Sequence, residues 1–241
     1  MKKIDIRTNE LNGSIKELES FTYSISHDLR APLRSMNSYA SILIDEFSGE
    51  INQEGQRYIS VIQRNALKMG QLLDALLNYT RIGRRDLSKT RFDMKEIVQE
   101  IAKETKRTRI TGAEIRIGEM HNALADPLMI KEVWDHLINN ALKFSAGRDD
   151  ALIEIGSEIR QDEIIYFIKD NGVGFNMNYH HKLFGLFQQL HDERTYGGIG
   201  VGLAISKRII TKHKGRIWAD SQPGVGATFY FSLPAVSEPA R

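Results

Sequence analysis

His27 is the residue whose type and surroundings most directly suggest chemistry, in the stretch SISHDLRAPL. In a helix whose apolar ladder includes Ile25 and Leu29, His27 falls at the position farthest from the ladder and points to solvent. Asp28 can take up one ring proton, which leaves the other ring nitrogen as a nucleophile. Pro32 removes a backbone donor and predicts a kink beside the histidine. An ordinary surface histidine near a tolerated proline is the competing interpretation.

Two glycine-rich stretches predict a phosphate-binding site. DNGVGF, at residues 170–175, follows a predicted strand, and its glycines allow the backbone to approach a ligand while Asp170 offers an acceptor. GGIGVGL, at residues 197–203, opens a helix, so free backbone N–H groups and the helix dipole converge on an anion. It matches neither a P-loop nor a dinucleotide-binding fingerprint. By itself the first stretch also fits a plain turn.

A third group of polar residues ends the preceding helix, in NNALKFS at residues 139–145. Asn140 can offer an amide oxygen to Mg²⁺, and Lys143 a charge to phosphates. Taken alone, both residues fit equally well as the polar end of a helix. The stretch GVGAT at residues 224–228 would, taken alone, be a hairpin turn.

The elements that position these residues fall into two parts. Residues 8–47 and 59–80 carry apolar ladders at alternating steps of four and three, separated by a break at residues 48–52, which predicts an antiparallel helical hairpin. One hairpin has too little core to stand alone, so we expect two chains to pair into a dimeric four-helix bundle. The ladder of the first helix consists of Leu11, Ile15, Leu18, Thr22, Ile25, Leu29, Pro32, Met36, Tyr39 and Leu43.

The second part alternates helical and strand patterns. Helices are predicted over residues 92–104, 125–144 and 206–213, and strands over residues 151–159, 163–170, 215–221 and 227–233. Mostly hairpin-joined strands with interspersed helices indicate an α/β sandwich, one sheet with helices on one face. We place the domain boundary between residues 86 and 87, giving domains of residues 1–86 and 87–241.

Composition excludes several classes of protein. The 241 residues have a formal net charge of +2 and no cysteine. A nucleic acid is therefore not an expected partner, and disulfide frameworks and thiolate metal sites are excluded. The chain carries no apolar run of transmembrane length and no signal-peptide pattern. We therefore expect a soluble, cytoplasmic protein without membrane contact from these residues.

In combination, these motifs resemble a known family. SISHDLRAPL resembles the phosphoacceptor box of sensor histidine kinases of two-component systems. The ordered set N-A-x-K-F-S, D-x-G-x-G-F, L-F-x-x-F, G-x-G-x-G-L and G-x-G-x-T-F resembles the nucleotide boxes of their Bergerat-type ATPase domain. The resemblance covers residues 18–234, and several phrases look most like phytochrome-type and hybrid kinases.

The resemblance implies a transmitter that phosphorylates His27 from ATP and Mg²⁺, with Asp28 as acid/base partner, and passes the phosphoryl group to a response regulator. It makes Asn140 the magnesium ligand, Lys143 a phosphate contact and Asp170 the acceptor for the adenine amine. Residues 176–196 would form a mobile lid held by Phe184 and Phe187. The remaining residues expected at the ATP site are Phe144, Gly172, Gly174, Gly198, Gly200, Gly202, Leu203 and Thr228.

Two positions depart from the family pattern. Ala31 stands where many relatives carry Thr or Asn that positions a hydrolytic water, so we expect weak or absent phosphatase activity. His136 stands where relatives commonly have Asn, and related ATPases a glutamate. Imidazole there could act as a base or line the site as a polar group, and the lining role is favoured.

Two other functions stay open. A chaperone-like or mismatch-repair-like ATPase would hydrolyse ATP to water, but would not need SISHDLRAPL and normally has the missing glutamate. A dimerising scaffold with a vestigial ATP site is the non-enzymatic alternative. The sequence does not identify the stimulus or the regulator, nor decide whether phosphorylation occurs within one chain or between two.

Overall fold

The computed structural model describes residues 2–108 and 112–235, and side chains are described except at 2–21, 23, 106–108, 193 and 194. The chain divides into two compact units, Met1–Arg84 and Arg85–Arg241. Among the described residues, no helix has an apolar stretch long enough to cross a membrane.

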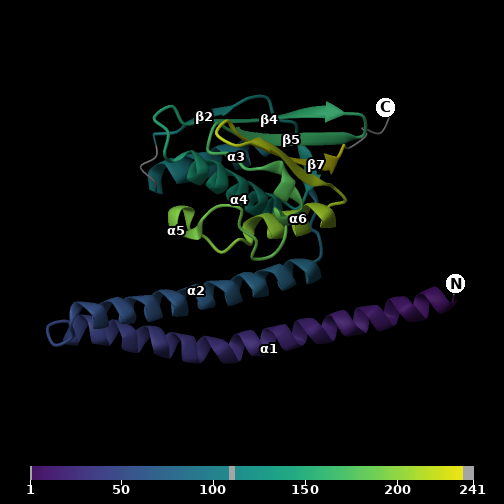
Figure 1. Cartoon of the computed structure of the whole chain (residues 1–241). Coiled ribbons are helices and arrows are strands. Elements are labelled where there is room, and N and C mark those ends of the chain that lie inside the picture. The colour runs from purple at the N-terminus through teal and green to yellow at the C-terminus, as the bar shows by residue number, and fades with distance from the viewer. Residues whose placement is uncertain (1, 109–111, 236–241) are drawn as a thin grey trace. The chain divides into compact units, whose positions relative to one another are not determined.

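The first unit is a hairpin of two long helices, α1 (Lys2–Phe47) and α2 (Gln53–Arg84) (Figure 1). The connection is tight, because Glu50 and Ile51 both donate their N–H groups to the carbonyl of Phe47. The Asn52 side chain then accepts from the N–H of Gly55 and caps the start of α2. α1 stays helical through Pro32, so the proline does not end the helix.

The contact between α1 and α2 differs from the predicted ladder. Among the described side chains of α1, the buried ones are Ser26, Leu33 and Ala40, which are spaced seven residues apart and between 1% and 4% exposed. Ladder residues such as Ile25, Leu29, Met36, Tyr39 and Leu43 are instead 39% to 68% exposed. Of these three buried side chains, Ser26 and Ala40 are small and Leu33 is large. The larger ladder residues therefore lie outside the contact between the two helices. Leu11, Ile15 and Leu18 lie outside the described side chains.

The helices and strands of the second unit are β1 Thr90–Phe92, α3 Met94–Thr108, β2 Glu114–Ile117, β3 Ala123–Ala125, α4 Pro127–Ser145, β4 Leu152–Arg160, β5 Glu163–Asp170, a 3₁₀ helix Met177–Lys182, α5 Glu193–Tyr196, α6 Gly202–Lys212, β6 Ile217–Gln222 and β7 Gly226–Pro234.

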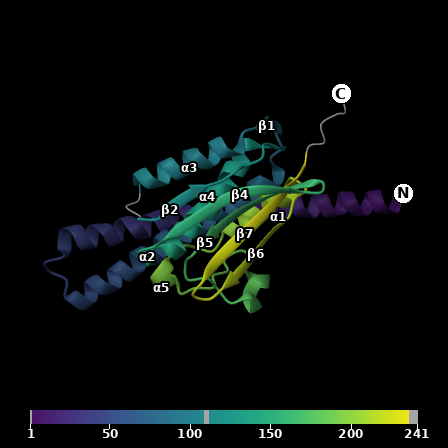
Figure 2. The same cartoon turned by 90° about the horizontal axis from the view of Figure 1, so that it is seen from above.

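The second unit is a mixed five-stranded sheet with α3, α4 and α6 on one face (Figures 1 and 2). The strand order is β2-β4-β5-β7-β6, and within this sheet only the β2–β4 pair is parallel. A separate two-stranded sheet pairs β1 with β3. The sandwich prediction is confirmed.

The core of this unit lies between the sheet and α4. Trp134 meets the rings of Tyr166 and Phe231 edge-on at 6.4 and 5.2 Å between centroids, and those two rings stack at 5.0 Å. All three side chains are fully buried. This packing fixes α4 against β5 and β7, and so holds the polar end of α4 in place beside the end of β5.

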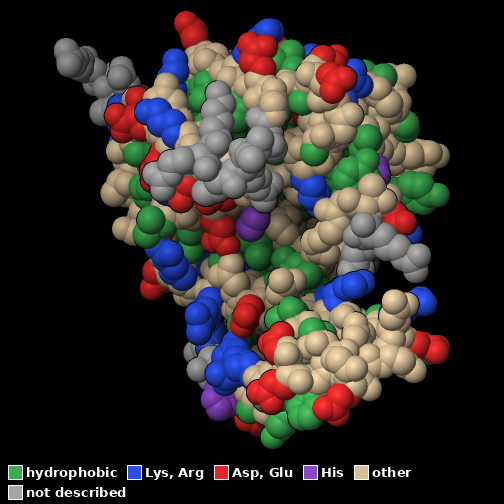
Figure 3. Space-filling model, turned by 90° about the vertical axis from the view of Figure 1, so that its left-hand side faces the viewer, with side chains coloured by type: hydrophobic (Ala, Val, Ile, Leu, Met, Phe, Trp, Pro, Cys, Tyr) green, Lys and Arg blue, Asp and Glu red, His purple; other side chains and the backbone are tan. Residues whose placement is uncertain are grey.

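The surface of the second unit carries both signs of charge. On the face that Figure 3 presents, Lys and Arg side chains are interspersed with Asp and Glu. This arrangement agrees with the formal net charge of +2 for the whole chain.

Candidate functional site

His27 lies on α1 with its side chain 71% exposed, as its helical position predicts. Its Nδ1 is 3.3 Å from Oδ1 of Asp28, whose side chain is 76% exposed. A hydrogen bond from Nδ1–H to this carboxylate places the proton on Nδ1, so the lone pair lies on Nε2. One turn along the helix, Arg30 donates to Asp74 of α2 at 2.8 Å, which ties this part of α1 to its neighbour. The imidazole is thus accessible and directed by its carboxylate.

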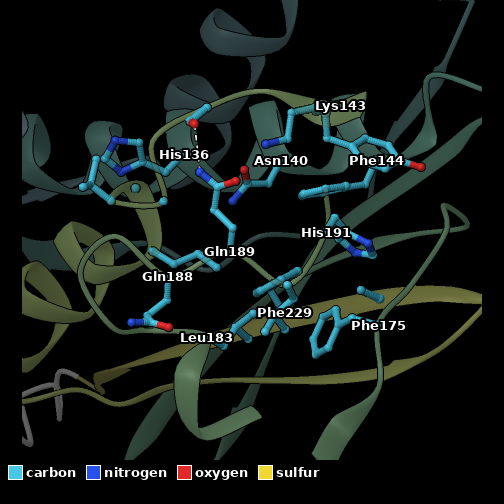
Figure 4. Close-up of a pocket in the computed structure, with 18 of the residues that line it drawn as sticks. His136, Asn140, Lys143, Phe144, Phe175, Leu183, Gln188, Gln189, His191 and Phe229 are labelled. Atoms are coloured by element: carbon cyan, nitrogen blue, oxygen red, sulfur yellow. Dashed lines mark hydrogen bonds between the residues drawn. The ribbon is translucent and has the colours of Figure 1, made fainter. Parts of the chain in front are cut away.

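The second unit contains a pocket of about 260 Å³. One side is formed by α4, which supplies His136, Asn140, Lys143 and Phe144 (Figure 4). The apolar floor includes Phe175, Phe229 and Leu183. Ten predicted site residues line it, namely His136, Asn140, Lys143, Phe144, Asp170, Gly174, Gly198, Gly200, Gly202 and Leu203. A mostly apolar cavity with a few converging polar groups suits a nucleotide, because the base can be buried while its polar edge is bound.

Asp170 is the acidic group of the pocket, at the end of β5. It is 5% exposed, and its Oδ1 accepts from the N–H of Gly172 at 2.9 Å. Burial raises the pKa of Asp170 to about 6, and the N–H groups of Gly172 and Ala227 oppose that rise. A buried carboxylate with one oxygen held by the backbone can present an acceptor to a ligand amine.

The glycine loop before α6 also lines the pocket. Gly197, Gly198 and Gly200 have φ of +63°, +94° and +69°, conformations that other residues rarely adopt. A side chain at Gly200 would collide with the backbone of Gln188, so this glycine also permits the close approach of the two segments. α6 then begins at Gly202, with its unpaired N–H groups and positive dipole end at the pocket.

Lys143 brings positive charge to this loop. Its Nζ lies 3.4 Å from the carbonyl oxygen of Gly197 and 4.4 Å from the centre of the Phe144 ring. The loop is also tied by Gln189, whose Nε2 donates to the carbonyl of Gly198 at 2.9 Å (Figure 4). A cation beside backbone N–H groups at a helix start is suited to bind phosphate.

His136 lies on α4 at the pocket, beside Gly202. Burial lowers the pKa of His136 to about 4, so its imidazole is neutral at physiological pH. A base with so low a pKa is poorly matched to proton abstraction near pH 7. Of the two roles expected for this residue, the structure thus favours the polar lining role.

Three of the residues expected at the ATP site do not line the pocket. Gly172 contributes indirectly, because a side chain there would collide with the carbonyl of Phe144 and separate β5 from α4. Thr228 alternates with Phe229 along β7 and therefore lies on the opposite face of the sheet from the pocket. Phe187 is 44% exposed and has φ of 60°, an unusual conformation for an aromatic residue.

The structure adds two pocket residues from the span 176–196 that were not predicted individually. The rings of His191 and Tyr196 lie 4.9 and 5.2 Å from Phe144 and 5.3 Å from each other, and all three line the pocket. Burial and the charge of Lys143 lower the pKa of His191, so the ring is neutral and packs as an aromatic group. The sequence predicts only the span of this segment, because nothing in the spacing of its residues shows which side chains turn toward the pocket.

A metal ion beside Asn140 would need ligands from a bound nucleotide as well as from the protein. Among the described residues, no group of three or more His, Asp or Glu side chains comes together. A cation beside Asn140 would therefore take most of its ligands from phosphate and water. Mg²⁺ is commonly bound in this way, with few protein ligands, so the residues present fit it.

Comparisons with known proteins agree with both parts of the chain. The family described as His Kinase A (phospho-acceptor) domain matches residues 17–85. The family described as histidine kinase-, DNA gyrase B-, and HSP90-like ATPase matches residues 125–237.

Relatives of the whole chain include the phytochrome-like protein Cph1 of Synechocystis sp., which is 35% identical over 93% of this chain and 30% of that protein. The methanogenesis regulatory histidine kinase FilI of Methanothrix harundinacea is 32% identical over 95% of this chain and 26% of that protein. The chain thus spans less than a third of the length of these two relatives.

Solved structures share the fold. Full-length ShkA in complex with AMPPNP superposes with a TM-score of 0.66 at 21% identity, over 92% of this chain and 47% of that chain. The Acinetobacter baumannii histidine kinase AdeS superposes with a TM-score of 0.59 at 22% identity, over 88% of this chain and 98% of that chain.

Proposed function

Since the chain belongs to the sensor histidine kinases, with their phosphoacceptor and ATPase domains in one chain, we propose that it phosphorylates its own His27 from ATP. The phosphoryl group then passes to an aspartate of a response regulator. The observation that carries the proposal is an exposed histidine, directed by Asp28, on the same chain as a pocket suited to a nucleotide.

In this proposal, different parts of the pocket bind the base, the phosphates and the metal ion of the nucleotide. The carboxylate of Asp170 accepts from the adenine amine, while Phe144 and the apolar floor bury the base. The N–H groups of the loop at residues 197–202 and the charge of Lys143 bind the phosphates. Asn140 offers its amide oxygen to Mg²⁺, which when bound neutralises phosphate charge during transfer.

His27 acts as the nucleophile. Asp28 holds the proton on Nδ1, so Nε2 presents its lone pair to the γ-phosphorus. A bond forms between Nε2 and phosphorus while the bond from phosphorus to the bridging oxygen breaks, and ADP leaves with that electron pair. In the second step the N–P bond breaks as an aspartate oxygen of the regulator bonds to phosphorus. Positioning supplies most of the catalysis.

Transfer also requires relative movement of the two units. We propose that residues 81–89 contain the hinge. Within the second unit, Asp126 binds the side chain of Arg85 at 3.4 Å and the N–H of Ser88 at 3.2 Å. These contacts hold residues 85–88 to that unit, so the movement is expected at the end of α2, before Arg85.

The proposal includes the partners and compartment of the reaction. We propose that the chain acts as a homodimer in the cytoplasm, where ATP is available. The regulator would dock on the hairpin around residues 33–41 and 61–71.

Labelling with γ-³²P-ATP tests the kinase assignment. Wild-type protein should acquire label that is lost in acid and stable in base, as phosphohistidine is. His27→Gln should abolish the label and keep nucleotide affinity, because residue 27 is outside the pocket. Label retained in that variant would overturn the assignment, whereas loss of nucleotide affinity would show that the substitution disturbs more than the acceptor.

ATP hydrolysis without a phosphoprotein is the alternative enzymatic function. The missing glutamate argues against it, because the neutral His136 is a poor base for activating water. A vestigial site is disfavoured by the intact set of Asn140, Asp170 and the glycine loop around one pocket.

A further inference from the structure

His136 and Asn140 lie four residues apart on α4, and both line the pocket. Residues at this spacing are neighbours on one face of a helix, about 5–6 Å apart between Cβ atoms. Paired metal ligands on helices commonly use the same spacing. Figure 4 shows both side chains, with Lys143, along the α4 side of the pocket. An imidazole and the proposed magnesium ligand therefore occupy adjacent positions.

The hydrogen bonds around His136 determine its tautomer. The hydroxyl of Ser206 donates its only proton to the carbonyl of Gly202 at 2.9 Å. Nδ1 of His136 is 3.3 Å from the same Ser206 oxygen, which is left to act as an acceptor. Nδ1 must then carry the ring proton, and the lone pair lies on Nε2.

This arrangement has the features of a metal-ligating histidine. Such residues donate one ring N–H to a fixed oxygen, which orients the ring and directs the other nitrogen at the metal. Ser206 is fully buried and bonded to its own helix, so its oxygen is a fixed partner. A Cβ atom at Gly202, the first residue of α6, would lie 3.0 Å from Cδ2 of His136, so the ring lies beside the start of this helix, where the phosphates are proposed to bind.

We propose that Nε2 of His136 and the amide oxygen of Asn140 together bind the nucleotide-associated cation, and that the nitrogen ligand shifts the preference of the site from Mg²⁺ toward Mn²⁺ and other first-row transition ions. The inference rests on the nucleotide function proposed above. Mg²⁺ takes oxygen ligands, whereas imidazole binds transition ions more readily. An asparagine at position 136 would supply oxygen instead, so the histidine distinguishes this chain at its metal site.

Pulsed electron paramagnetic resonance tests the ligand directly. The full chain, with all histidines ¹⁵N-labelled, is examined with Mn²⁺ and unlabelled ADP. The echo modulation should show ¹⁵N coupled to Mn²⁺, which adenine nitrogens cannot produce because they remain ¹⁴N. The coupling should be lost in His136→Asn and kept in His121→Asn, a histidine outside the pocket. Absence of ¹⁵N coupling in the wild-type complex would overturn the proposal.

Metal titration at fixed ADP provides a second measurement. In the wild type, the ratio of the Mg²⁺ to the Mn²⁺ half-saturation concentration should exceed that of His136→Asn by about tenfold, as expected for a lost metal contact. Equal ratios would contradict the nitrogen ligand even if ADP binds normally. Failure of the wild type to bind ADP with either metal would refute the nucleotide function and the inference with it.

Discussion

At the scale of single residues, the carboxyl group of Asp170 combines an observed structural contact with a proposed binding function in one buried position. It orders the turn after β5 through Gly172, and it is proposed to accept the adenine amine. Both functions use the ionised form. Burial opposes ionisation and raises its pKa to about 6, so its charge changes within an accessible pH range.

Nucleotide affinity should therefore fall in mild acid. With a pKa of about 6, Asp170 is ionised in about nine of ten molecules at pH 7 and in about one of ten molecules at pH 5. If only the ionised form binds adenine, the ADP dissociation constant at pH 5 should be about tenfold above its value at pH 7. Calorimetric titration measures it. Asp170→Asn, which cannot ionise, should bind weakly without this pH step, and a wild-type constant that is equal at both pH values would contradict the role.

Ala31 predicts a low phosphatase activity. Its methyl side chain, four residues after His27, has no group that can position a water. Ala31→Thr supplies a hydroxyl at this exposed helical position, so it should accelerate dephosphorylation of a phosphorylated regulator by about tenfold or more, within the usual range for a positioned polar group. The decay of ³²P-labelled regulator measures this. Rapid decay with the wild-type chain would refute the prediction.

At the scale of elements, α4 is the helix on which most of the polar pocket depends. Its N-terminus is fixed by Asp126, whose Oδ1 accepts from the N–H groups of Leu128 and Met129. The backbone N–H of Asp126 in turn donates to Nε2 of the buried His213, at the end of α6. The start of α4 and the end of α6 are thus joined, and both helices meet the nucleotide pocket at their other ends.

Loss of this cap should cost stability. Asp126→Ala removes the α4 cap and leaves the N–H of Ser88 without its acceptor, so the free energy of unfolding should fall by about 2–3 kcal/mol. Urea denaturation measures the change. The matched control is Asp93→Ala, which removes an exposed cap on the N–H of Lys95 at the start of α3 and should cost about 0.5–1 kcal/mol. An equal cost for both variants would contradict the added role of Asp126.

Long elements of this fold could be predicted from sequence, and short ones could not. The strand at Glu163–Asp170 was predicted with its observed bounds, because it carries a continuous β-branched and aromatic run. The strands at Thr90–Phe92 and Ala123–Ala125 were missed, since three residues are too few to show alternation. The pocket side chains on α4 followed from motif spacing, whereas the inward turn of His191 and Tyr196 depends on a loop conformation that spacing does not specify.

At the scale of the whole molecule, the described part of the hairpin exposes an apolar face. Its exposed members include Leu29, Met36, Leu43, Ile62 and Met69, each between 41% and 52% exposed. Contiguous exposed apolar side chains are a mark of association. The large apolar side chains exposed on this face favour a four-helix bundle of two chains.

Sedimentation equilibrium tests this association. The wild-type chain should have the mass of a dimer. Met36→Glu should raise the dissociation constant of the dimer at least tenfold, because the dimer would bury the new charge in the proposed interface. The substitution leaves the contact between α1 and α2 within one chain intact. Arg57→Glu, at an exposed polar position of α2, should remain dimeric. A monomeric wild type, or a Met36→Glu dimer of unchanged affinity, would contradict the bundle.

A single-turnover reaction followed by ³¹P NMR tests the central claim most directly, since it separates a kinase from an ATPase. With ATP and Mg²⁺ in stoichiometric amounts and no regulator, the account predicts ADP together with a phosphohistidine signal. Peptide mapping under basic conditions should assign the phosphoryl group to His27, and Asp170→Ala should give little of either product. ADP and free phosphate without any phosphoprotein signal would contradict the account.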